Sequence, residues 1–332
     1  MIKIKKNIAI VTGGAGFIGS HLVDLLLKKK YEVRVIDNLL GGRVQNLEQN
    51  KDNKKLKFRK IDINRIFYKD EIFKNVKYIF HLAGIGDIVP SIENPSKYMF
   101  SNVQGTVNLL EAARFAKVKK FIYAASSSCY GICNKRTSEN EKINPQYPYA
   151  LSKNLGEQAV LNWHKVYNLP VNSIRIFNAY GPRVRTSGAY GAVFGVFFKQ
   201  RLKNKPLTII GNGNQKRDFI YVTDVAEAFL KAATTSHNGE IFNLGNDNPQ
   251  SINKLARLIG GKKVFIPDRP GEPKKTWANT SKIKRMLKWK PKIKFEEGVK
   301  LMLDQISSWE KAPLWTPKTI KIATKTWFKY LK

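Results

Sequence analysis

A glycine-rich turn between a strand-like and a helix-like segment limits the fold of this chain more than any other feature. Residues 8–12 (Ile-Ala-Ile-Val-Thr) form a short apolar run rich in β-branched side chains, which predicts a buried parallel strand. Gly13, Gly16 and Gly19 follow it, and residues 20–30 carry apolar side chains at helical spacing. In this order, the backbone can approach a pyrophosphate and offer it the amides of a helix N-terminus. The alternative is a glycine turn that binds no ligand.

A carboxylate at the end of the next strand-like run favours the ligand-binding interpretation. Asp37 follows residues 32–36, at the position where a carboxylate accepts hydrogen bonds from the ribose of adenosine. It also repels a 2′-phosphate, so NAD is favoured over NADP, while Arg43 leaves NADP open. Asp62 follows the strand-like residues 56–61 and is expected to border the adenine, with a turn or a helix cap as the alternative.

Strands and helices alternate over the first 125 residues. Two further strand-like runs lie at residues 76–82 and 120–125, and residues 101–116 between them have a helical pattern. This alternation predicts an α/β fold of the Rossmann type, with a doubly wound parallel sheet that binds ligands at the carboxyl ends of its strands.

The pattern changes after residue 182. Residues 192–202 and 222–234 are predicted to be helices, and residues 207–210 and 241–244 short strands. Short helices and Pro/Gly turns then alternate, which indicates a smaller C-terminal α/β substrate-binding domain. The expected division is an NAD-binding domain over residues 1–182, onto which residues 222–246 pack, and a second domain built from residues 183–221 and 247–332.

The charge and the cysteines narrow the class of partner. The formal net charge is +34, but the lysines are scattered along the chain and no nucleic-acid recognition motif accompanies them. We therefore expect no nucleic-acid partner, while the positive field favours an anionic small substrate. Cys129 and Cys133 lack the further Cys or His of a metal site, so no metal is expected. Two cysteines and no signal-peptide core indicate a cytoplasmic protein.

Tyr149 and Lys153 are the residues that indicate chemistry. Residues four apart share one face of a helix, so the lysine ammonium can lie beside the tyrosine oxygen. There it would favour the phenolate and lower a pKa that is about 10 in water. A tyrosine tuned in this way exchanges protons with an alcohol near neutral pH. Ser126, Ser127 and Ser128 follow a predicted strand ahead of this pair, where a polar turn is the alternative.

In these motifs the chain resembles the extended short-chain dehydrogenase/reductases, and within them the NAD-dependent nucleotide-sugar epimerases and dehydratases. The resemblance extends over nearly the whole chain. It is carried by residues 12–19, Asp37 and Asn38, 81–84 (His-Leu-Ala-Gly), the three serines, Tyr149 and Lys153, 175–182 (Arg-Ile-Phe-Asn-Ala-Tyr-Gly-Pro), 211–213, 217–219 and 269–272.

The resemblance implies a role for each site residue. Tyr149 would be the acid/base on the sugar 4-hydroxyl, Lys153 would hold the nicotinamide ribose, and Ser126 would bind the reacting oxygen. The implied cofactor-binding residues are Gly13, Gly16, Phe17, Ile18, Gly19, Asp37, Asn38, Asp62, Ile63, Leu82, Ala83 and Lys153. The implied substrate-binding residues are Ser127, Ser128, Asn178, Arg217, Arg269, Glu272 and Thr276. Among these, Asn178 and the two arginines would hold the diphosphate, for which a planar guanidinium is suited.

The serines also indicate the reaction within the family. The 4,6-dehydratases carry Thr-Asp-Glu at the positions of Ser126, Ser127 and Ser128, and the decarboxylases keep a Glu at the third position. The absence of these acidic residues favours a UDP-hexose 4-epimerase that acts through a transient 4-keto sugar. The expected cellular role is the synthesis of surface polysaccharide precursors. A small Thr276 leaves N-acetylhexoses and hexuronates open as substrates. The alternatives are a dehydratase, a decarboxylase, a 4-keto reductase, or a dinucleotide-sensing protein without catalysis. A homodimer through residues 101–116 and 150–166 is a further implication.

The C-terminal residues predict a basic amphipathic helix. Lysines at 318, 321, 325, 329 and 332 recur every three or four residues, with Ile320, Trp327, Phe328 and Leu331 between them. We expect its aromatic face to dock on the protein. Peripheral contact with an anionic membrane is the less favoured alternative.

Overall fold

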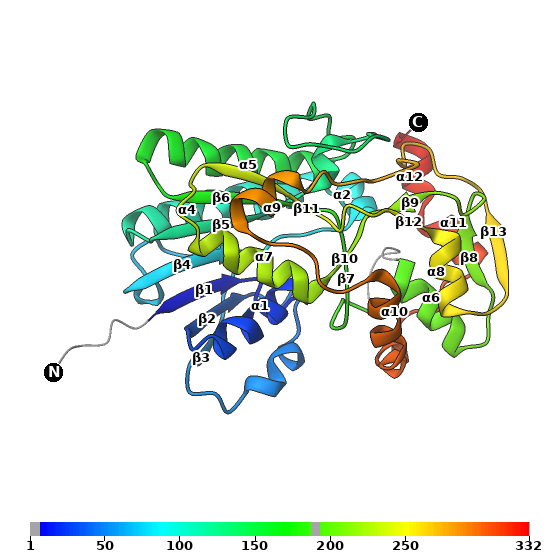
Figure 1. The fold of residues 1–332 in the computed structure, drawn as a ribbon, viewed down its shortest axis with the longest axis horizontal. Helices are drawn as coiled ribbons and strands as arrows, with labels where there is room; N and C mark the ends of the chain where they lie inside the picture. Colours follow the sequence, from blue (N-terminus) through cyan, green and yellow to red (C-terminus); the bar gives the residue numbers. More distant parts are fainter. Residues whose placement is uncertain (1–6, 187–192, 332) are drawn as a thin grey trace.

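The computed structural model describes residues 7–186 and 193–331. Within them lies a central seven-stranded sheet in the order β11-β6-β5-β4-β1-β2-β3, in which all neighbours are parallel (Figure 1). This sheet confirms the predicted fold class. Its strands are β1 (Ile8–Thr12), β2 (Glu32–Asp37), β3 (Leu56–Lys60), β4 (Val76–His81), β5 (Lys120–Ser126), β6 (Val171–Ile176) and β11 (Glu240–Leu244).

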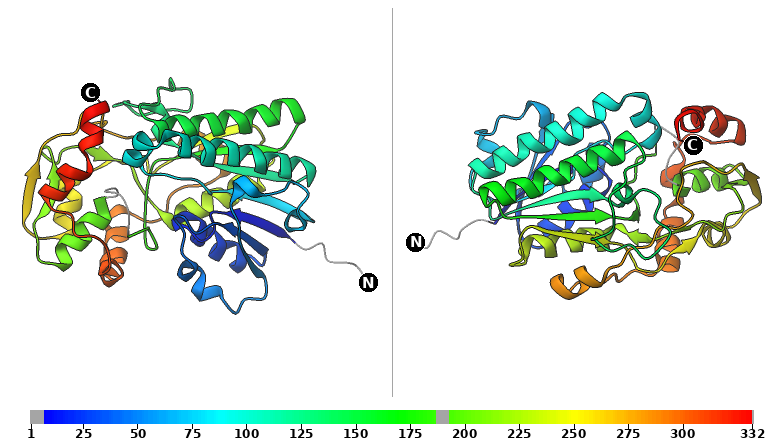
Figure 2. Two further views of the ribbon diagram at one scale, coloured as in Figure 1. Left: turned by 180° about the vertical axis from the view of Figure 1, so that it is seen from behind. Right: turned by 90° about the horizontal axis from the view of Figure 1, so that it is seen from above.

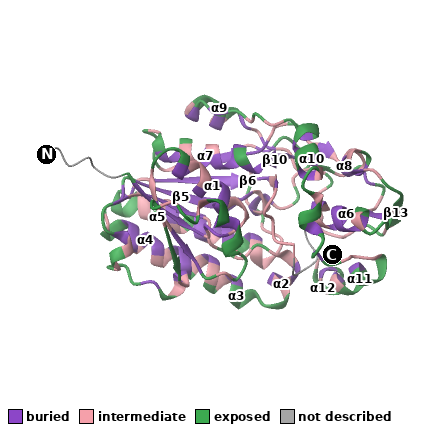
Figure 3. Cartoon of the chain, turned by 90° about the horizontal axis from the view of Figure 1, so that it is seen from below, coloured by how far each residue is buried: buried purple, intermediate pink, exposed green. Residues whose placement is uncertain are grey.

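Helices cover both faces of the sheet. Helices α1 (Phe17–Lys28) and α7 (Val222–Thr234) pack on one face, and α4 (Gly105–Phe115) and α5 (Pro148–Tyr167) on the other (Figure 1 and Figure 2). Every residue of β1 and β5 is buried, as Figure 3 shows for the sheet as a layer. Continuous apolar runs such as the one at 8–12 form these strands because both of their faces leave water.

The strand order reverses beside β1. This strand lies between β2 and β4, so the connections on its two sides run in opposite directions and leave a crevice at the carboxyl ends. The glycine turn, the segments that follow β4 and β5, and the first turn of α5 all begin at this edge. The sheet therefore brings together groups that are far apart in sequence.

Most element boundaries lie within three residues of the predicted ones. Helix α1 begins at Phe17, so that the third glycine of the turn lies inside its first turn. The helix expected at 101–116 is α4, preceded by a π-helical segment at Phe100–Gln104. Helix α6 (Val193–Leu202) has the predicted end, and residue 192 lies outside the described residues.

A second hydrophobic core lies beside the sheet. It joins α6, α8 (Ile252–Ile259) and α10 (Phe295–Leu303) to the parallel pair β8 (Leu207–Ile210) and β13 (Lys263–Ile266). β11 and α7 belong instead to the core that α1 forms with the central sheet. The division into two domains stays a prediction. The remaining helices and strands are α2 (Ile88–Glu93), α3 (Pro95–Met99), α9 (Ser281–Leu287), β7 (Asn178–Tyr180), β9 (Lys216–Arg217), β10 (Phe219–Tyr221) and β12 (Gln250–Ser251). Short 3-10 turns lie at Val44–Asn50, Ile63–Arg65, Glu71–Phe73, Ser127–Tyr130 and Ile306–Trp309.

The C-terminal segment differs from the single helix that was predicted. It forms two short helices, α11 (Pro317–Ala323) and α12 (Lys325–Tyr330), separated at Thr324. The hydroxyl of Thr324 is buried and donates to the carbonyl of Ile320 at 2.8 Å, which competes with a continuous helix. Ile320 and Trp327 are buried, so the expected docking of apolar side chains is confirmed for these two, while Phe328 is exposed. Lys332 lies outside the described residues. No helix in the described ranges has the length and apolarity needed to cross a membrane.

Deleting residues 314–332 should lower the melting temperature. The Trp327 side chain alone is expected to contribute on the order of 3–5 kcal/mol, as buried aromatic side chains do in cores. Thermal unfolding followed by circular dichroism measures the effect, and Phe328→Ala is the control because this side chain is exposed. An unchanged melting temperature together with loss of liposome binding would instead support the membrane alternative.

Candidate active site

A pocket of about 370 Å³ lies at the carboxyl ends of β1, β2 and β4. The segment after β4 approaches the glycine turn so closely that a Cβ at Gly13 would lie 2.7 Å from the backbone nitrogen of Ala83. Gly13 also has φ +68°, and a Cβ at Gly19 would collide with the carbonyl oxygen of Gly13. The pocket is lined by eleven of the predicted cofactor-binding residues: Gly13, Gly16, Phe17, Ile18, Gly19, Asp37, Asn38, Asp62, Ile63, Leu82 and Ala83.

Asp37 is fixed at the end of β2 by two backbone amides. Its carboxylate accepts from the nitrogen of Ala15 at 3.0 Å and from that of Leu39 at 2.8 Å. Burial raises the pKa of Asp37, and these two hydrogen bonds oppose the rise. Asp62 caps the turn that follows it by accepting from the nitrogen of Asn64 at 2.9 Å. It also accepts a hydrogen bond from Asn38 at 3.1 Å. Asp62 therefore caps the turn and lines the pocket at the same time.

Tyr149 and Ser126 come together where β5 ends and α5 begins. Tyr149 shares a side-chain hydrogen bond with Ser126, the last residue of β5. The predicted lowering of the Tyr149 pKa by Lys153 is not found. Removal from water by the surrounding chain raises the pKa of Tyr149, and the bond with Ser126 opposes that rise.

The ammonium of Lys153 lies beside Tyr123 and the residues that follow β4. Its Nζ lies 4.4 Å from the ring centroid of Tyr123, and a Cβ at Gly84 would lie 3.9 Å from it. Burial lowers the pKa of Lys153 to about 8, and Glu157 opposes this effect. The ammonium is thus held beside the wall formed by the residues after β4, where it can bind a ribose hydroxyl.

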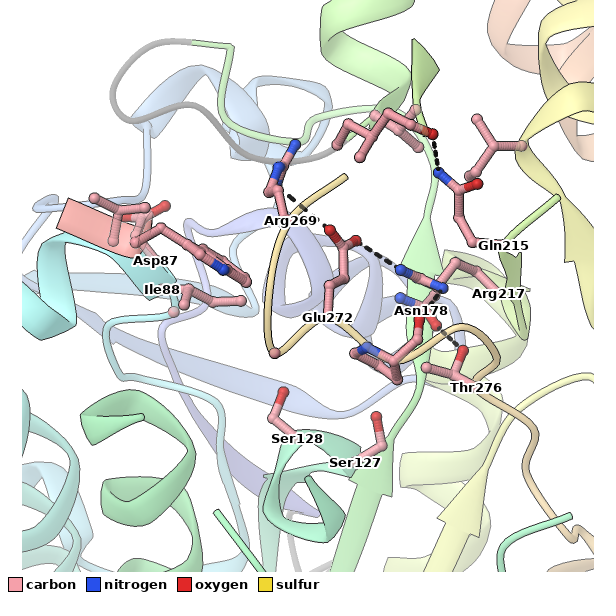
Figure 4. A pocket seen from close by; sticks show the side chains of 18 of the residues that line it. Asp87, Ile88, Ser127, Ser128, Asn178, Gln215, Arg217, Arg269, Glu272 and Thr276 are labelled. Carbon is pink, nitrogen blue, oxygen red and sulfur yellow. Dashed lines mark hydrogen bonds and ion pairs between the residues drawn. The ribbon is translucent and has the colours of Figure 1, made fainter. Parts of the chain in front are cut away.

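A second pocket, of about 490 Å³, adjoins the first. Gly86 and Asp87 line both pockets. Ala124 of β5 lines the first pocket and Ser127 the second, so the strand passes from one to the other at Ser126. All seven predicted substrate-binding residues line the second pocket: Ser127, Ser128, Asn178, Arg217, Arg269, Glu272 and Thr276 (Figure 4).

Two arginines flank one carboxylate in this second pocket (Figure 4). Arg217 donates to Glu272 Oε1 at 2.6 Å, and the Arg269 guanidinium lies 3.9 Å from Glu272 Oε2. Both arginine side chains are largely buried, so neither is a solvated surface charge. Among the described residues, Glu272 Oε2 is one of few buried side-chain oxygens without a hydrogen-bond donor. A hydroxyl of a bound nucleotide would supply that donor.

Asn178 and Thr276 are joined directly on the same wall. The hydroxyl of Thr276 donates to Asn178 Oδ1 at 2.7 Å and accepts from the nitrogen of Asp218 at 3.1 Å. Thr276 is therefore held by two partners at the position where a larger side chain would narrow the pocket.

The structure adds residues that the sequence did not indicate. Asp87 forms an ion pair with Arg185 at 2.8 Å, and the two residues lie 98 positions apart. Tyr147 and Trp327 line the second pocket, and Tyr147 shares a hydrogen bond with Ser128. Of these residues, only Tyr147 could have been found from the sequence, because it lies two residues before Tyr149. In the described ranges, no three His, Cys, Asp or Glu side chains are grouped as a metal site.

Comparison with known proteins assigns the class of this site. Residues 9–245 match the NAD dependent epimerase/dehydratase family. The chain belongs to this family, which confirms the resemblance found in the sequence, and it is an NAD-dependent enzyme. The residues that line the first pocket fit this cofactor, because the glycines leave the backbone open to a pyrophosphate and Asp37 would accept hydrogen bonds from a ribose.

Individual relatives are similar over nearly their whole length. A putative UDP-glucose 4-epimerase of Methanocaldococcus jannaschii is 37% identical over 304 residues, 89% of this chain and 97% of the relative. The UDP-N-acetylglucosamine 4-epimerase of Methanobrevibacter ruminantium, solved with UDP-N-acetylmuramic acid, has a TM-score of 0.84 at 32% identity, covering 91% of this chain and 100% of the relative. The UDP-glucuronic acid 4-epimerase of Bacillus cereus, solved with UDP-glucuronic acid and NAD, has a TM-score of 0.84 at 34% identity, with 91% and 99% covered.

The stability of the protein should rise between about pH 8 and pH 10.5 relative to that of a Lys153→Met variant. The folded-state pKa of Lys153 is lowered to about 8, so in this window the unfolded chain binds a proton that the folded chain does not. Urea midpoints at pH 7, 8.5 and 10 measure the difference. Lys165→Met, at an exposed position of the same helix, should show no such trend. A difference that stays constant with pH would contradict the assigned burial of the ammonium.

Proposed function

We propose that this protein is a nucleotide-sugar 4-epimerase that acts on a UDP-linked sugar. The observation that carries the proposal is the hydrogen bond between Tyr149 and Ser126. Along the chain, Ser126 lies between Ala124, which lines the pocket that fits NAD, and Ser127, which lines the pocket with two buried arginines. A diphosphate held by Arg217 and Arg269 would leave the attached sugar facing this pair. The names of the relatives agree in the reaction and differ in the sugar.

The residues around the pair favour epimerisation over elimination. Ser127 and Ser128 line the substrate pocket with neutral hydroxyls, at the positions where the resemblance implies carboxyl groups in dehydratases and decarboxylases. No carboxylate is therefore placed there to remove a second proton from the sugar. The remaining chemistry is a reversible oxidation at one carbon, which needs one proton carrier.

The chain's own residues would hold and move that proton. As the phenolate, Tyr149 would take the proton of the sugar 4-hydroxyl, and Ser126 would hydrogen-bond the reacting oxygen. The positive charge of bound NAD would favour this phenolate against the rise in pKa that burial causes. Bound NAD would supply the acceptor for the C4 hydride and the donor that returns it to the opposite face of C4. After the 4-keto sugar has turned about its bond to the diphosphate and its opposite face has been reduced, Tyr149 gives the proton back to the C4 oxygen. Lys153 holds the nicotinamide ribose, and Glu272 accepts from the ribose of the nucleotide.

The sugar and the cellular role are part of the same proposal. Thr276 is small enough to admit a 2-acetamido group, so glucose, galactose and their N-acetyl forms are the proposed sugars. The product would be a precursor of surface polysaccharide, made in the cytoplasm. The unpaired thiols of Cys129 and Cys133 fit a reducing compartment, which cell fractionation can test.

Purified protein should convert at least one UDP-sugar to its 4-epimer without added NAD. The substrates to offer are UDP-glucose, UDP-galactose, their N-acetyl forms and UDP-glucuronate, with products resolved by chromatography. Tyr149→Phe should lower kcat by about 10²–10⁴, the usual contribution of a proton-transferring side chain. Tyr167→Phe, on the same helix but exposed, should be fully active. Net formation or consumption of NADH with no 4-epimer from any substrate would refute the epimerase proposal.

We further propose a homodimer through α4 and α5. Large apolar side chains are exposed at the ends of these helices, at Phe115, Val166 and Tyr167. The guanidinium of Arg114 on α4 lies 4.9 Å from the ring of Tyr167 on α5, so the two ends form one surface. Exposed apolar side chains that gather on one surface are typical of an interface between subunits.

Val166→Asp should shift the protein from dimer to monomer, because a desolvated carboxylate opposes burial of this surface. Sedimentation velocity measures the mass. Ile322→Asp, at an exposed apolar position of α11, is the control and should leave the mass unchanged. A wild-type protein that sediments as a monomer would contradict the proposed dimer.

A further inference from the structure

The C-terminal helix α12 forms part of the substrate pocket. Trp327 is only 5% exposed and lines the pocket together with Arg269 and Tyr147. Its ring centroid lies 6.3 Å from that of Tyr147, which in turn stacks on the ring of Tyr149 at 6.3 Å. The ring of Tyr147 thus lies between Trp327 of α12 and Tyr149, the residue assigned to proton transfer.

Helix α12 holds the loop that carries Arg269. The indole Nε1 of Trp327 donates to the carbonyl of Pro270 at 2.7 Å. The guanidinium of Arg269 lies 5.6 Å from the indole centroid, within the range of a cation–π contact. A Cβ at Gly271 would lie 3.4 Å from Leu331, so the next residue of the loop also packs on this segment. Three consecutive loop residues are therefore in contact with or beside α12.

The same helix is anchored to the NAD-binding side of the molecule. The hydroxyl of Thr326 donates to Glu93 Oε1 of α2 at 2.9 Å. Helix α2 begins with Ile88 and Val89, which line the substrate pocket. The views agree that α12 lies beside α2 (Figure 1 and Figure 3). A helix fixed to α2 on one side and to residues 269–271 on the other sets the distance between them.

We propose that Trp327 is a positioning residue that holds Arg269 over the diphosphate of the bound nucleotide. This inference rests on the proposed function. The Arg269 loop has no regular secondary structure, so an unsupported arginine there would lose conformational freedom on binding. Glu272, 3.9 Å away, is a competing partner for its charge. The indole face holds the guanidinium through a contact that does not neutralise its charge.

A double-mutant cycle on UDP binding tests this assignment, because UDP carries the diphosphate but cannot be epimerised. Arg269→Ala should weaken UDP binding by about 10–100-fold, the usual effect of a lost charged hydrogen bond. Trp327→Ala should weaken it by about tenfold, with bound NAD retained and KM raised much more than kcat is lowered. In the Arg269→Ala background, Trp327→Ala should add less than about threefold, since the two residues act as one unit.

Two variants keep the test interpretable. Trp327→Phe preserves the ring and removes the donor to Pro270, so its UDP affinity should lie between those of the wild type and Trp327→Ala. It also replaces Trp327→Ala in the cycle if the latter fails to fold, with the same lack of additivity expected. Phe328→Ala, exposed on the same helix, should bind UDP as the wild type does. Multiplicative losses in the double variant, or unchanged binding by Trp327→Ala, would overturn the inference. A wild type that does not bind UDP would refute the proposed function instead.

Discussion

A buried ion pair between Glu157 and Arg175 fixes the helix that carries Tyr149 and Lys153. The guanidinium Nε lies 3.0 Å from the carboxylate, and both side chains are almost fully excluded from water. Glu157 is on α5 and Arg175 on β6, so the pair joins a helix of one layer to the sheet beneath it. Removing one partner from a buried pair leaves a charge without compensation, at a cost of about 3–5 kcal/mol.

The same arginine also orients the turn that follows Ser126. The Nη1 of Arg175 donates to the hydroxyl of Tyr130 at 2.8 Å, and this hydroxyl in turn donates to Asn243 Oδ1 of β11 at 2.7 Å. One network therefore holds the end of β5 and the start of α5 in register with the sheet. The hydrogen bond between Ser126 and Tyr149 depends on both of these positions, so the geometry of the reacting pair follows from a contact outside both pockets.

The reacting groups themselves are placed at a cost in stability. Lys153 keeps an ammonium in a site that lowers its pKa to about 8, and Glu272 keeps one carboxylate oxygen without a donor. Each would be more stable in water. The glycine turn, Asp37 and the Tyr149–Lys153 spacing are local patterns, which is why the sequence alone predicted the fold and site residues that line both pockets. The contacts of Trp327 in the substrate pocket and the Asp87–Arg185 pair could not be predicted, because their partners lie far away in sequence and only the folded chain brings them together. The break in the C-terminal helix was missed for a similar reason: the burial of Thr324 is a tertiary effect.

The large positive charge of the chain can be related to substrate binding through the carboxylates at and near the substrate pocket, which already have partners. The carboxylate of Asp218 accepts hydrogen bonds from the backbone amides of Ala278, Asn246 and Asp247. Burial raises the pKa of Asp218 to about 6. Asp87 and Glu272, the carboxylates that line the substrate pocket, are each paired with an arginine. Arg269 lies farther from Glu272 than Arg217 does, at 3.9 Å against 2.6 Å. A pocket whose acids are already paired attracts a dianionic diphosphate more strongly than the net charge of the surface would suggest, because the attraction acts where water is largely excluded.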